Sequence, residues 1–136
     1  KEEDETKVSK VKIEKIAKQD ERIIMTGFVQ GEELEELFSN AYLYCLPSDV
    51  EGMPISLMEA MSYGRNCLIS DIEENVQVCG EYGVTFKKSN LDDLTNKLNL
   101  CLNGKSRFEE NAISNYILNR YNWDDVVEKT EKLYRK

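Results

Sequence analysis

Residues 43–70, LYCLPSDVEGMPISLMEAMSYGRNCLIS, decide the fold of this chain. The apolar run 43–47 stops at its own proline and predicts a strand. Residues 55 to about 63 predict a helix, with Gly64 just past its end. NCLIS (66–70) predicts a second strand. A strand, a helix and a strand in this order favour two parallel strands of one sheet, joined by a helix on its face.

The same alternation continues on both sides of this stretch. Helices are predicted over about 6–19, 31–41, 73–80, 91–102, 106–120 and 123–135, and further strands over 22–26 and 84–86. In the helix over 91–102, the spacing predicts that five residues face inward: Leu91, Leu94, Leu98, Cys101 and Leu102. Strands that alternate with helices predict an α/β fold, with a mostly parallel sheet flanked by helices, in one domain over residues 1–136.

The composition excludes several classes of function. Of the 136 residues, 40% are hydrophobic and 32% are charged, and the apolar runs are too short to span a membrane. The formal net charge is −8, which repels phosphate backbones and argues against general nucleic-acid binding. The chain has no histidine, which excludes Ser-His-Asp and Cys-His hydrolase sites and histidine-ligated metals.

The four cysteines are Cys45, Cys67, Cys79 and Cys101, and no two of them form a C-x-x-C pair. Cys45 and Cys67 lie inside apolar runs. Reduced cysteines in a cytosolic core are the favoured interpretation, and a disulfide or metal framework is the alternative.

Glu51 and Glu59 stand on either side of a predicted helix start, directly after a strand. The helix that begins with Pro54 in its first turn leaves the amides of residues 55–57 without intrahelical partners, which suits an anion such as phosphate. Gly52 permits unusual backbone angles and a close approach of a ligand. Carboxylates accept hydrogen bonds, so sugar hydroxyls are natural partners of the two glutamates. In parallel sheets, ligands bind at this carboxyl edge of the strands.

The spacing alone leaves a second interpretation open. Glutamates are common near helix starts because the helix dipole favours them, and Glu59 is equally compatible with a solvated position. A ligand site and an ordinary surface loop therefore both fit the pattern.

The stretch TGFVQGEELEELFSNAYLYCLPSDVEGMPISLMEAMSYG (26–64) resembles the C-terminal, nucleotide-sugar-binding domain of retaining GT-B glycosyltransferases of family 4 (glycosyl transferases group 1). The residues that match the family's pattern are Pro47, Ser48, Glu51, Gly52, Glu59, Ala60, Met61 and Gly64. The likeness covers about 22–136, including LISD (68–71) and YNWDDVVEKTEKLY (121–134). It implies a partial Rossmann-like GT-B domain whose first two strands are missing from this chain.

The resemblance implies a role for each site residue. Glu51, the first glutamate of the family's E-x(7)-E motif, would be the catalytic residue that contacts donor-sugar hydroxyls near the reacting carbon. Glu59 would hold the ribose hydroxyls of the nucleotide. The other donor-binding residues would act mostly through their backbone: Gly52, Met53, Pro54, Ile55, Ser56 and Leu57 beside the sugar and diphosphate, and Phe28 and Val29 beside the base. No cofactor and no metal is expected, because in the family the leaving diphosphate is thought to help deprotonate the acceptor.

Several parts of the family's pattern have no counterpart here. A Gly-rich turn and an Arg/Lys pair that hold the diphosphate are missing, as is the N-terminal acceptor domain, so the chain is expected to be an inactive fragment of a longer enzyme. Arg65, Lys87 and Lys88 do not stand at equivalent positions and are expected to be solvated. The missing strands would lie between 22–26 and 43–47. We therefore expect these two strands to pair directly, or a dimer to form through unpaired strand edges.

The implied function is sugar transfer from a nucleotide-diphosphate sugar to an acceptor hydroxyl, in glycan or polysaccharide synthesis. The expected location is the cytoplasm, with the full-length enzyme at the inner membrane face. Ser70 and Asp71 match the family's pattern and are expected to be structural. The alternative is a non-catalytic interaction module that keeps the fold, but both glutamates are intact and argue against it. A flavodoxin-like nucleotide binder does not fit, because no Gly-rich phosphate loop follows a first strand.

Overall fold

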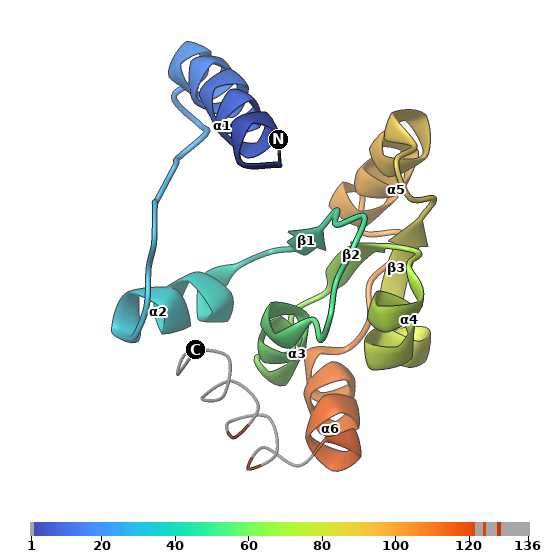
Figure 1. Ribbon diagram of the computed structural model, residues 1–136. Coiled ribbons are helices and arrows are strands. Elements are labelled where there is room, and N and C mark those ends of the chain that lie inside the picture. The colour runs from blue at the N-terminus through green and yellow to red at the C-terminus, as the bar shows by residue number, and fades with distance from the viewer. Residues whose placement is uncertain (1, 122–123, 125–127, 129–136) are drawn as a thin grey trace. The chain divides into compact units, whose positions relative to one another are not determined.

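The computed structural model describes residues 2–121, 124 and 128 (Figure 1). The chain divides into two compact units, Lys1–Leu34 and Glu35–Lys136, and each is considered by itself. The helix predicted over 123–135 lies almost entirely outside the described residues. No described helix is both long enough and apolar enough to cross a membrane.

The first unit contains one long helix, α1 (Glu2–Gln19), which agrees with the periodicity of residues 6–19. The strand predicted over 22–26 is wrong. Arg22 lies in a turn and binds Asp20, and the following residues are irregular and exposed, with Ile24 79% exposed. A strand is held by hydrogen bonds to a neighbouring strand, and the described part of the chain provides no partner for this segment. Its direct pairing with 43–47 is therefore also wrong.

The second unit is built on a parallel sheet, which confirms the predicted α/β fold. The sheet has the order β1-β2-β3, with β1 at Tyr44–Leu46, β2 at Cys67–Ser70 and β3 at Gly83–Phe86. Both pairings are parallel, and Leu68 in the centre lies opposite Cys45 on one side and Val84 on the other. All four residues of β2 are buried, as expected for a central strand covered on both faces.

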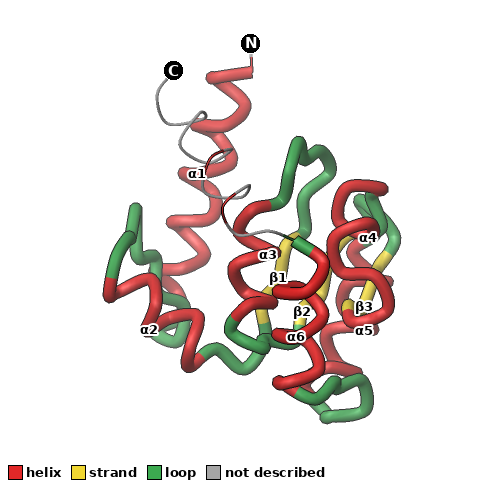
Figure 2. The backbone as a smooth tube through the Cα atoms, turned by 90° about the horizontal axis from the view of Figure 1, so that it is seen from below, coloured by secondary structure: helices red, strands yellow, loops and turns green. Residues whose placement is uncertain are grey.

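Helices cover both faces of this sheet. They are α3 (Ile55–Ser62), α4 (Glu73–Cys79), α5 (Leu91–Leu102) and α6 (Glu110–Arg120), with a short 3-10 turn η1 at Gly80–Tyr82. A further helix, α2 (Glu32–Asn40), precedes β1. Figure 1 shows α5 on one side of the strands and α3, α4 and α6 on the other, and Figure 2 shows the strands behind α3 and α6. This layering places the ends of the strands, rather than their faces, within reach of a ligand.

The core beneath α5 is smaller than the helical pattern predicts. Leu68, Phe86 and Cys101 form a buried cluster, against which Leu94 and Leu98 pack. The two ends of the predicted inward face are wrong, because Leu91 is 75% exposed and Leu102 is 56% exposed. The strands that α5 covers are only four residues long, so the first and last residues of this helix extend beyond them.

The end of α3 is fixed by Gly64, which lies in the left-handed region with φ of 73°. The amide of Gly64 donates to Met61 and that of Arg65 donates to Ala60, which is the Schellman arrangement. A Cβ at Gly64 would lie 2.7 Å from the carbonyl oxygen of Glu110. Glycine is therefore needed here both for the backbone angle and for the close packing of α3 against α6.

Candidate functional site

The loop 47–54 leaves the carboxyl end of β1 and enters α3 at Ile55. It therefore lies at the edge of a parallel sheet where the preceding strands direct their following loops, as the sequence predicts. Glu51 is half-buried within this loop, and Glu59 is half-buried in the second turn of α3. The structure thus brings both glutamates into the same strand–loop–helix unit.

Side chains from two neighbouring loops hold the loop 47–54 in place. The hydroxyl of Ser70, at the end of β2, donates to the carbonyl oxygen of Ser48. The hydroxyl of Ser89, in the loop after β3, donates to Oδ1 of Asp49 at 2.9 Å. Within the loop, the hydroxyl of Ser48 donates to Oε1 of Glu51 at 2.5 Å. The Glu51 carboxylate is therefore held by Ser48, in a loop that is itself held by side chains at the end of β2 and after β3.

The loops after β2 and β3 are also bound to each other. The amide of Asp71 donates to Phe86 at 2.9 Å, and the carboxylate of Asp71 accepts from the amide of Lys88 at 2.8 Å. Ser89 has φ of 58°, a left-handed conformation that is uncommon outside glycine. Ser89 is also the residue that donates to Asp49, so a strained backbone conformation accompanies the contact between these two loops.

The start of α3 differs in detail from its prediction. Pro54 precedes the helix as its N-cap rather than lying in the first turn, and no side chain caps the helix start. The amide of Ile55 is not free, because it donates to Met53 at 2.8 Å, and the first helical bond runs from Met58 to Pro54. The next two amides, of Ser56 and Leu57, precede that first helical bond and receive no side-chain cap. The predicted anion site at this helix start is therefore reduced to at most these two amides, and Leu57 has no exposed surface.

The other predicted donor-binding residues have different surroundings. Pro54 and Leu57 are buried, and Leu57 has no exposed surface, whereas Met53 is half-buried. Ser56 is exposed and shares a hydrogen bond of 2.6 Å with the Tyr44 hydroxyl. Gly52 does not use the left-handed φ that a glycine permits, and a Cβ there would meet nothing within 4 Å. The space beside Gly52 is therefore open, as the close approach of a ligand would require.

Glu59 has an unusual electrostatic environment. Phe38 of α2 stacks on Tyr63 of α3 with ring centroids 5.8 Å apart, which holds α2 beside α3 and brings Glu35 near Glu59. Burial, and then the charge of Glu35, raise the pKa of the Glu59 carboxyl above its ordinary value. Among the described residues, no Lys or Arg forms an ion pair with it. A partly desolvated carboxylate with a raised pKa makes Glu59 a candidate binding residue.

Phe28 and Val29 belong to the first unit, Lys1–Leu34. Phe28 is 80% exposed and Val29 is half-buried. Their predicted position beside the nucleotide base stays a prediction.

The basic residues near the site are only partly as expected. Lys87 and Lys88 are exposed, as predicted. Arg65 is not solvated: its side chain is 14% exposed, donates to the carbonyl oxygens of Ala41 and Tyr63, and forms an ion pair of 3.1 Å with Glu110. It therefore links the segments around α2, α3 and α6, and each of its three guanidinium nitrogens binds one of these groups.

Asn75, at the start of α4, is a residue that the sequence did not single out. It is fully buried, and its Nδ2 donates to the hydroxyl of Ser70 at 3.0 Å. Its Oδ1 has no hydrogen-bond partner, the one such case among buried side-chain atoms of the described residues. A polar residue on the inward face of a short helix was the available signal, since buried asparagine is rare without a specific partner.

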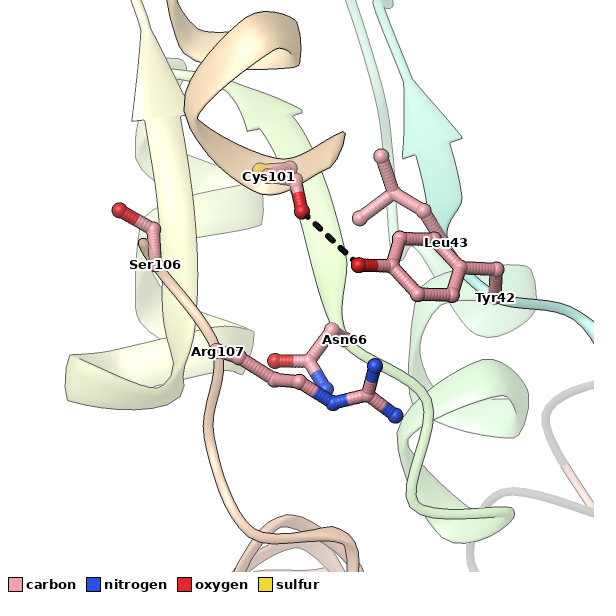
Figure 3. A pocket seen from close by; sticks show the side chains of 6 residues that line it. All are labelled: Tyr42, Leu43, Asn66, Cys101, Ser106 and Arg107. Atoms are coloured by element: carbon pink, nitrogen blue, oxygen red, sulfur yellow. Dashed lines mark hydrogen bonds between the residues drawn. The ribbon is translucent and has the colours of Figure 1, made fainter. Parts of the chain in front are cut away.

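A small cavity lies at the opposite, amino edge of the sheet (Figure 3). It measures about 10 Å³, which is about enough for one water molecule. The hydroxyl of Tyr42 crosses it and donates to Cys101 at 3.2 Å, and Asn66 beside it exchanges two hydrogen bonds with the backbone of Phe108. This cavity is structural, and Asn66 holds the loop that precedes α6.

The four cysteines are free thiols, with Cys45 exposed and the other three buried. Burial raises the pKa of the Cys79 thiol to about 11 and raises that of Cys67 further. No group of three or more Cys, Asp or Glu side chains in the described part of the chain is arranged to hold a metal ion.

Comparison with known proteins places these features in a family. The family model described as "Glycosyl transferases group 1" matches residues 2–119. The chain is 30% identical over 106 residues to an N,N'-diacetylbacillosaminyl-diphospho-undecaprenol alpha-1,3-N-acetylgalactosaminyltransferase of Campylobacter jejuni, an alignment that covers 75% of the chain and 28% of that enzyme. It is 28% identical over 116 residues to a UDP-Gal:alpha-D-GlcNAc-diphosphoundecaprenol alpha-1,3-galactosyltransferase of Escherichia coli, covering 83% of the chain and 30% of that enzyme.

Solved structures agree on the fold. A sucrose-phosphate synthase of Thermosynechococcus elongatus superposes with a TM-score of 0.75 at 20% identity, over 94% of this chain and 34% of that one. TarM superposes with a TM-score of 0.67 at 22% identity, over 93% of this chain and 27% of that one. The chain thus spans about a third or less of the proteins it matches. With the GT-B fold and a family model that matches most of its length, the chain belongs to the glycosyl transferases group 1 family.

Proposed function

We propose that this chain binds the nucleotide-sugar donor of a retaining glycosyltransferase that transfers a sugar to an acceptor hydroxyl in glycan or polysaccharide synthesis. The observation that carries this proposal is the uncapped start of α3, with Glu51 held before it and Glu59 one turn inside it. Donor dipoles of the helix start suit a diphosphate, and two carboxylates suit the hydroxyls on either side of it.

Each residue then has a specific task. Glu51 accepts hydrogen bonds from donor-sugar hydroxyls near the reacting carbon, and Glu59 accepts them from the ribose. Backbone groups from Gly52 to Ser56 line the sugar and the diphosphate. Catalysis would consist of positioning the donor and stabilising the departing diphosphate.

The reaction conserves the anomeric configuration when both bonds change on one face of the sugar. The bond from the anomeric carbon to the diphosphate oxygen breaks, a bond from the acceptor oxygen forms on the same face, and the acceptor proton passes to the diphosphate. In this proposal the protein supplies no metal and no general base of its own. We expect donor binding to be unchanged when EDTA is added.

Transfer requires more than the described site. We propose that an acceptor-binding domain completes the enzyme, that residues 1–136 alone transfer nothing, and that the enzyme works in the cytoplasm at the inner membrane face. The Escherichia coli relative carries UDP-galactose in its name, so UDP-sugars are the first donors to test.

Isothermal titration calorimetry tests the proposal directly. The full-length protein is titrated with UDP-galactose, UDP-N-acetylglucosamine, GDP-mannose and ADP-glucose, and one donor is expected to bind. Glu59→Ala should weaken this binding by about tenfold or more, because charge-assisted hydrogen bonds to the ribose are lost. Glu109→Ala is the matched control, since Glu109 is an exposed glutamate at the start of another helix, α6.

The competing function is a non-catalytic interaction module that keeps the fold. It predicts that no donor binds, or that Glu59→Ala and Glu109→Ala leave binding equally unchanged. Either result would overturn the enzyme proposal.

A further inference from the structure

We propose that Ser48, Ser70 and Asn75 form a positioning chain that orients Glu51 toward the donor sugar and so determines how strongly the sugar, rather than the nucleotide, is bound. The inference rests on the proposed donor site and adds to it the buried residues that make its first glutamate specific. Three consecutive hydrogen bonds carry the argument.

The directions of these bonds are determined by the groups involved. The hydroxyl of Ser70 has one proton, which it donates to the carbonyl oxygen of Ser48. It can therefore only accept from Asn75, whose Nδ2 lies 3.0 Å from it and 3.4 Å from the Ser70 carbonyl oxygen. The amide of Asn75 must present its nitrogen to Ser70, so its oxygen faces away.

The cost of this arrangement is visible in the core. Ser70 and Asn75 are both completely buried, and Oδ1 of Asn75 remains without a partner. An unpartnered buried acceptor destabilises the fold, and an apolar side chain at this position would avoid that cost. Such a residue is more readily explained by what its nitrogen holds than by the stability it provides.

The positioning chain leads to Glu51, the proposed catalytic residue. Ser70 fixes the peptide of Ser48 through its carbonyl oxygen, and the hydroxyl of the same Ser48 donates to Oε1 of Glu51 at 2.5 Å. One carboxylate oxygen is thereby engaged by the protein, which leaves Oε2 to accept from sugar hydroxyls. Glu59 is not part of this positioning chain, so the proposed contacts of Glu59 to the ribose do not depend on Ser48, Ser70 or Asn75.

The test compares each nucleotide sugar with its own nucleoside diphosphate: UDP-galactose with UDP, GDP-mannose with GDP, and ADP-glucose with ADP. Calorimetry on the full-length protein gives both dissociation constants. The constant for the nucleoside diphosphate divided by the constant for the nucleotide sugar measures the contribution of the sugar to binding. We expect Ser70→Ala to reduce this ratio by about tenfold and to leave nucleoside diphosphate binding unchanged. Ser114→Ala, which removes a similar hydroxyl-to-carbonyl bond within α6, is expected to change neither.

A double-mutant cycle separates positioning from general destabilisation. Glu51→Gln alone should also reduce the ratio, and adding Ser70→Ala to it should reduce the ratio no further, because Ser70 acts through Glu51. Ser48→Ala, at a half-buried position, gives the same test if Ser70→Ala does not fold.

Two results would overturn the inference: equal weakening of sugar and diphosphate binding in Ser70→Ala, or an effect of Ser70→Ala that persists undiminished beside Glu51→Gln. Wild-type protein that binds neither these six ligands nor UDP-N-acetylglucosamine would instead refute the proposed function, and the positioning chain with it.

Discussion

Two single residues at the candidate site, Glu59 and Gly52, differ in what they contribute to stability and to binding. Glu59 is partly desolvated beside the carboxylate of Glu35, an arrangement that opposes folding when both are charged. Gly52 is exposed, and a Cβ added there would meet no atom within 4 Å. Both positions are poorly explained by the fold alone, which is why they are the most informative residues to change.

Glu59→Gln is expected to stabilise the protein at neutral pH. The pKa of Glu59 is raised in the folded state, so the folded state binds the proton more tightly than the unfolded state does. The resulting penalty is absent below the unfolded pKa, grows as the pH rises, and is complete above the raised folded pKa. Urea denaturation should therefore show equal stability of the two proteins at pH 4 and a gain of less than ~1 kcal/mol for the variant at pH 7.5. A variant that is less stable than the wild type at pH 7.5 contradicts this assignment.

Gly52→Ala is expected to separate binding from stability. Its new methyl group meets no atom within 4 Å and requires no left-handed φ, so the free energy of unfolding should change by no more than about 0.5 kcal/mol. If the diphosphate approaches this backbone, the methyl group fills that space and donor affinity should fall by about tenfold. Unchanged affinity in calorimetry would remove Gly52 from the proposed site.

At the scale of elements, two helices end in the same way, but only one of these ends is packed against another helix. α3 ends at Gly64 with φ of 73°, and α5 ends at Gly104 with φ of 69°. In both, the backbone amides of the glycine and of the next residue, Arg65 or Lys105, donate hydrogen bonds to carbonyl oxygens in the last turn of the helix. Only Gly64 also lies against a neighbouring helix, since nothing surrounds Gly104 within 4 Å.

The pair Gly64→Ala and Gly104→Ala therefore isolates the packing of α3 on α6. Gly104→Ala should cost about 1 kcal/mol, the price of a left-handed alanine. Gly64→Ala should cost about 1–3 kcal/mol more, because its Cβ would lie 2.7 Å from the backbone oxygen of Glu110. Chemical denaturation of both variants measures the difference, and equal losses would show that α6 yields to the added methyl group.

At the scale of the whole molecule, the sheet ends on one side at β1, whose outer edge is unpaired among the described residues. The amide of Tyr44 donates to Asn66 beside β2, and successive residues of a strand alternate in direction, so the amide of Cys45 faces outward. An open edge of this kind can pair with a second chain. We therefore keep the dimer as a proposal, with β1 as its contact.

Cys45→Pro tests this edge without breaking the sheet. Proline removes the outward amide of Cys45 and leaves the bond from Tyr44 to Asn66 intact. If the chain associates through β1, sedimentation velocity should show dimers of the wild type and an association at least about tenfold weaker in the variant. Monomers at all concentrations, or dimers that persist in the variant, would exclude β1 as the contact.

The strand predicted over 22–26 shows where local pattern stops being informative. Its β-branched run has the composition of a strand, yet a strand exists only where another strand accepts its hydrogen bonds, and the described part of the chain provides none for it. The same reasoning explains Arg65, which was expected in solvent. The carbonyl of Ala41 and the carboxylate of Glu110 that bury it are separated from it by 24 and 45 residues.

The sequence by itself determined the alternation of helices and strands, the parallel sheet and the position of Glu51 and Glu59 beside a helix start, because these depend on periods and spacings of a few residues. The tertiary structure alone decided which residues hold the site together. Ser48 and Ser70 are 22 residues apart, and Asp49 and Ser89 are 40 apart. Their contacts exist because parallel strands bring their carboxyl ends to one edge, where side chains that are distant along the chain become neighbours.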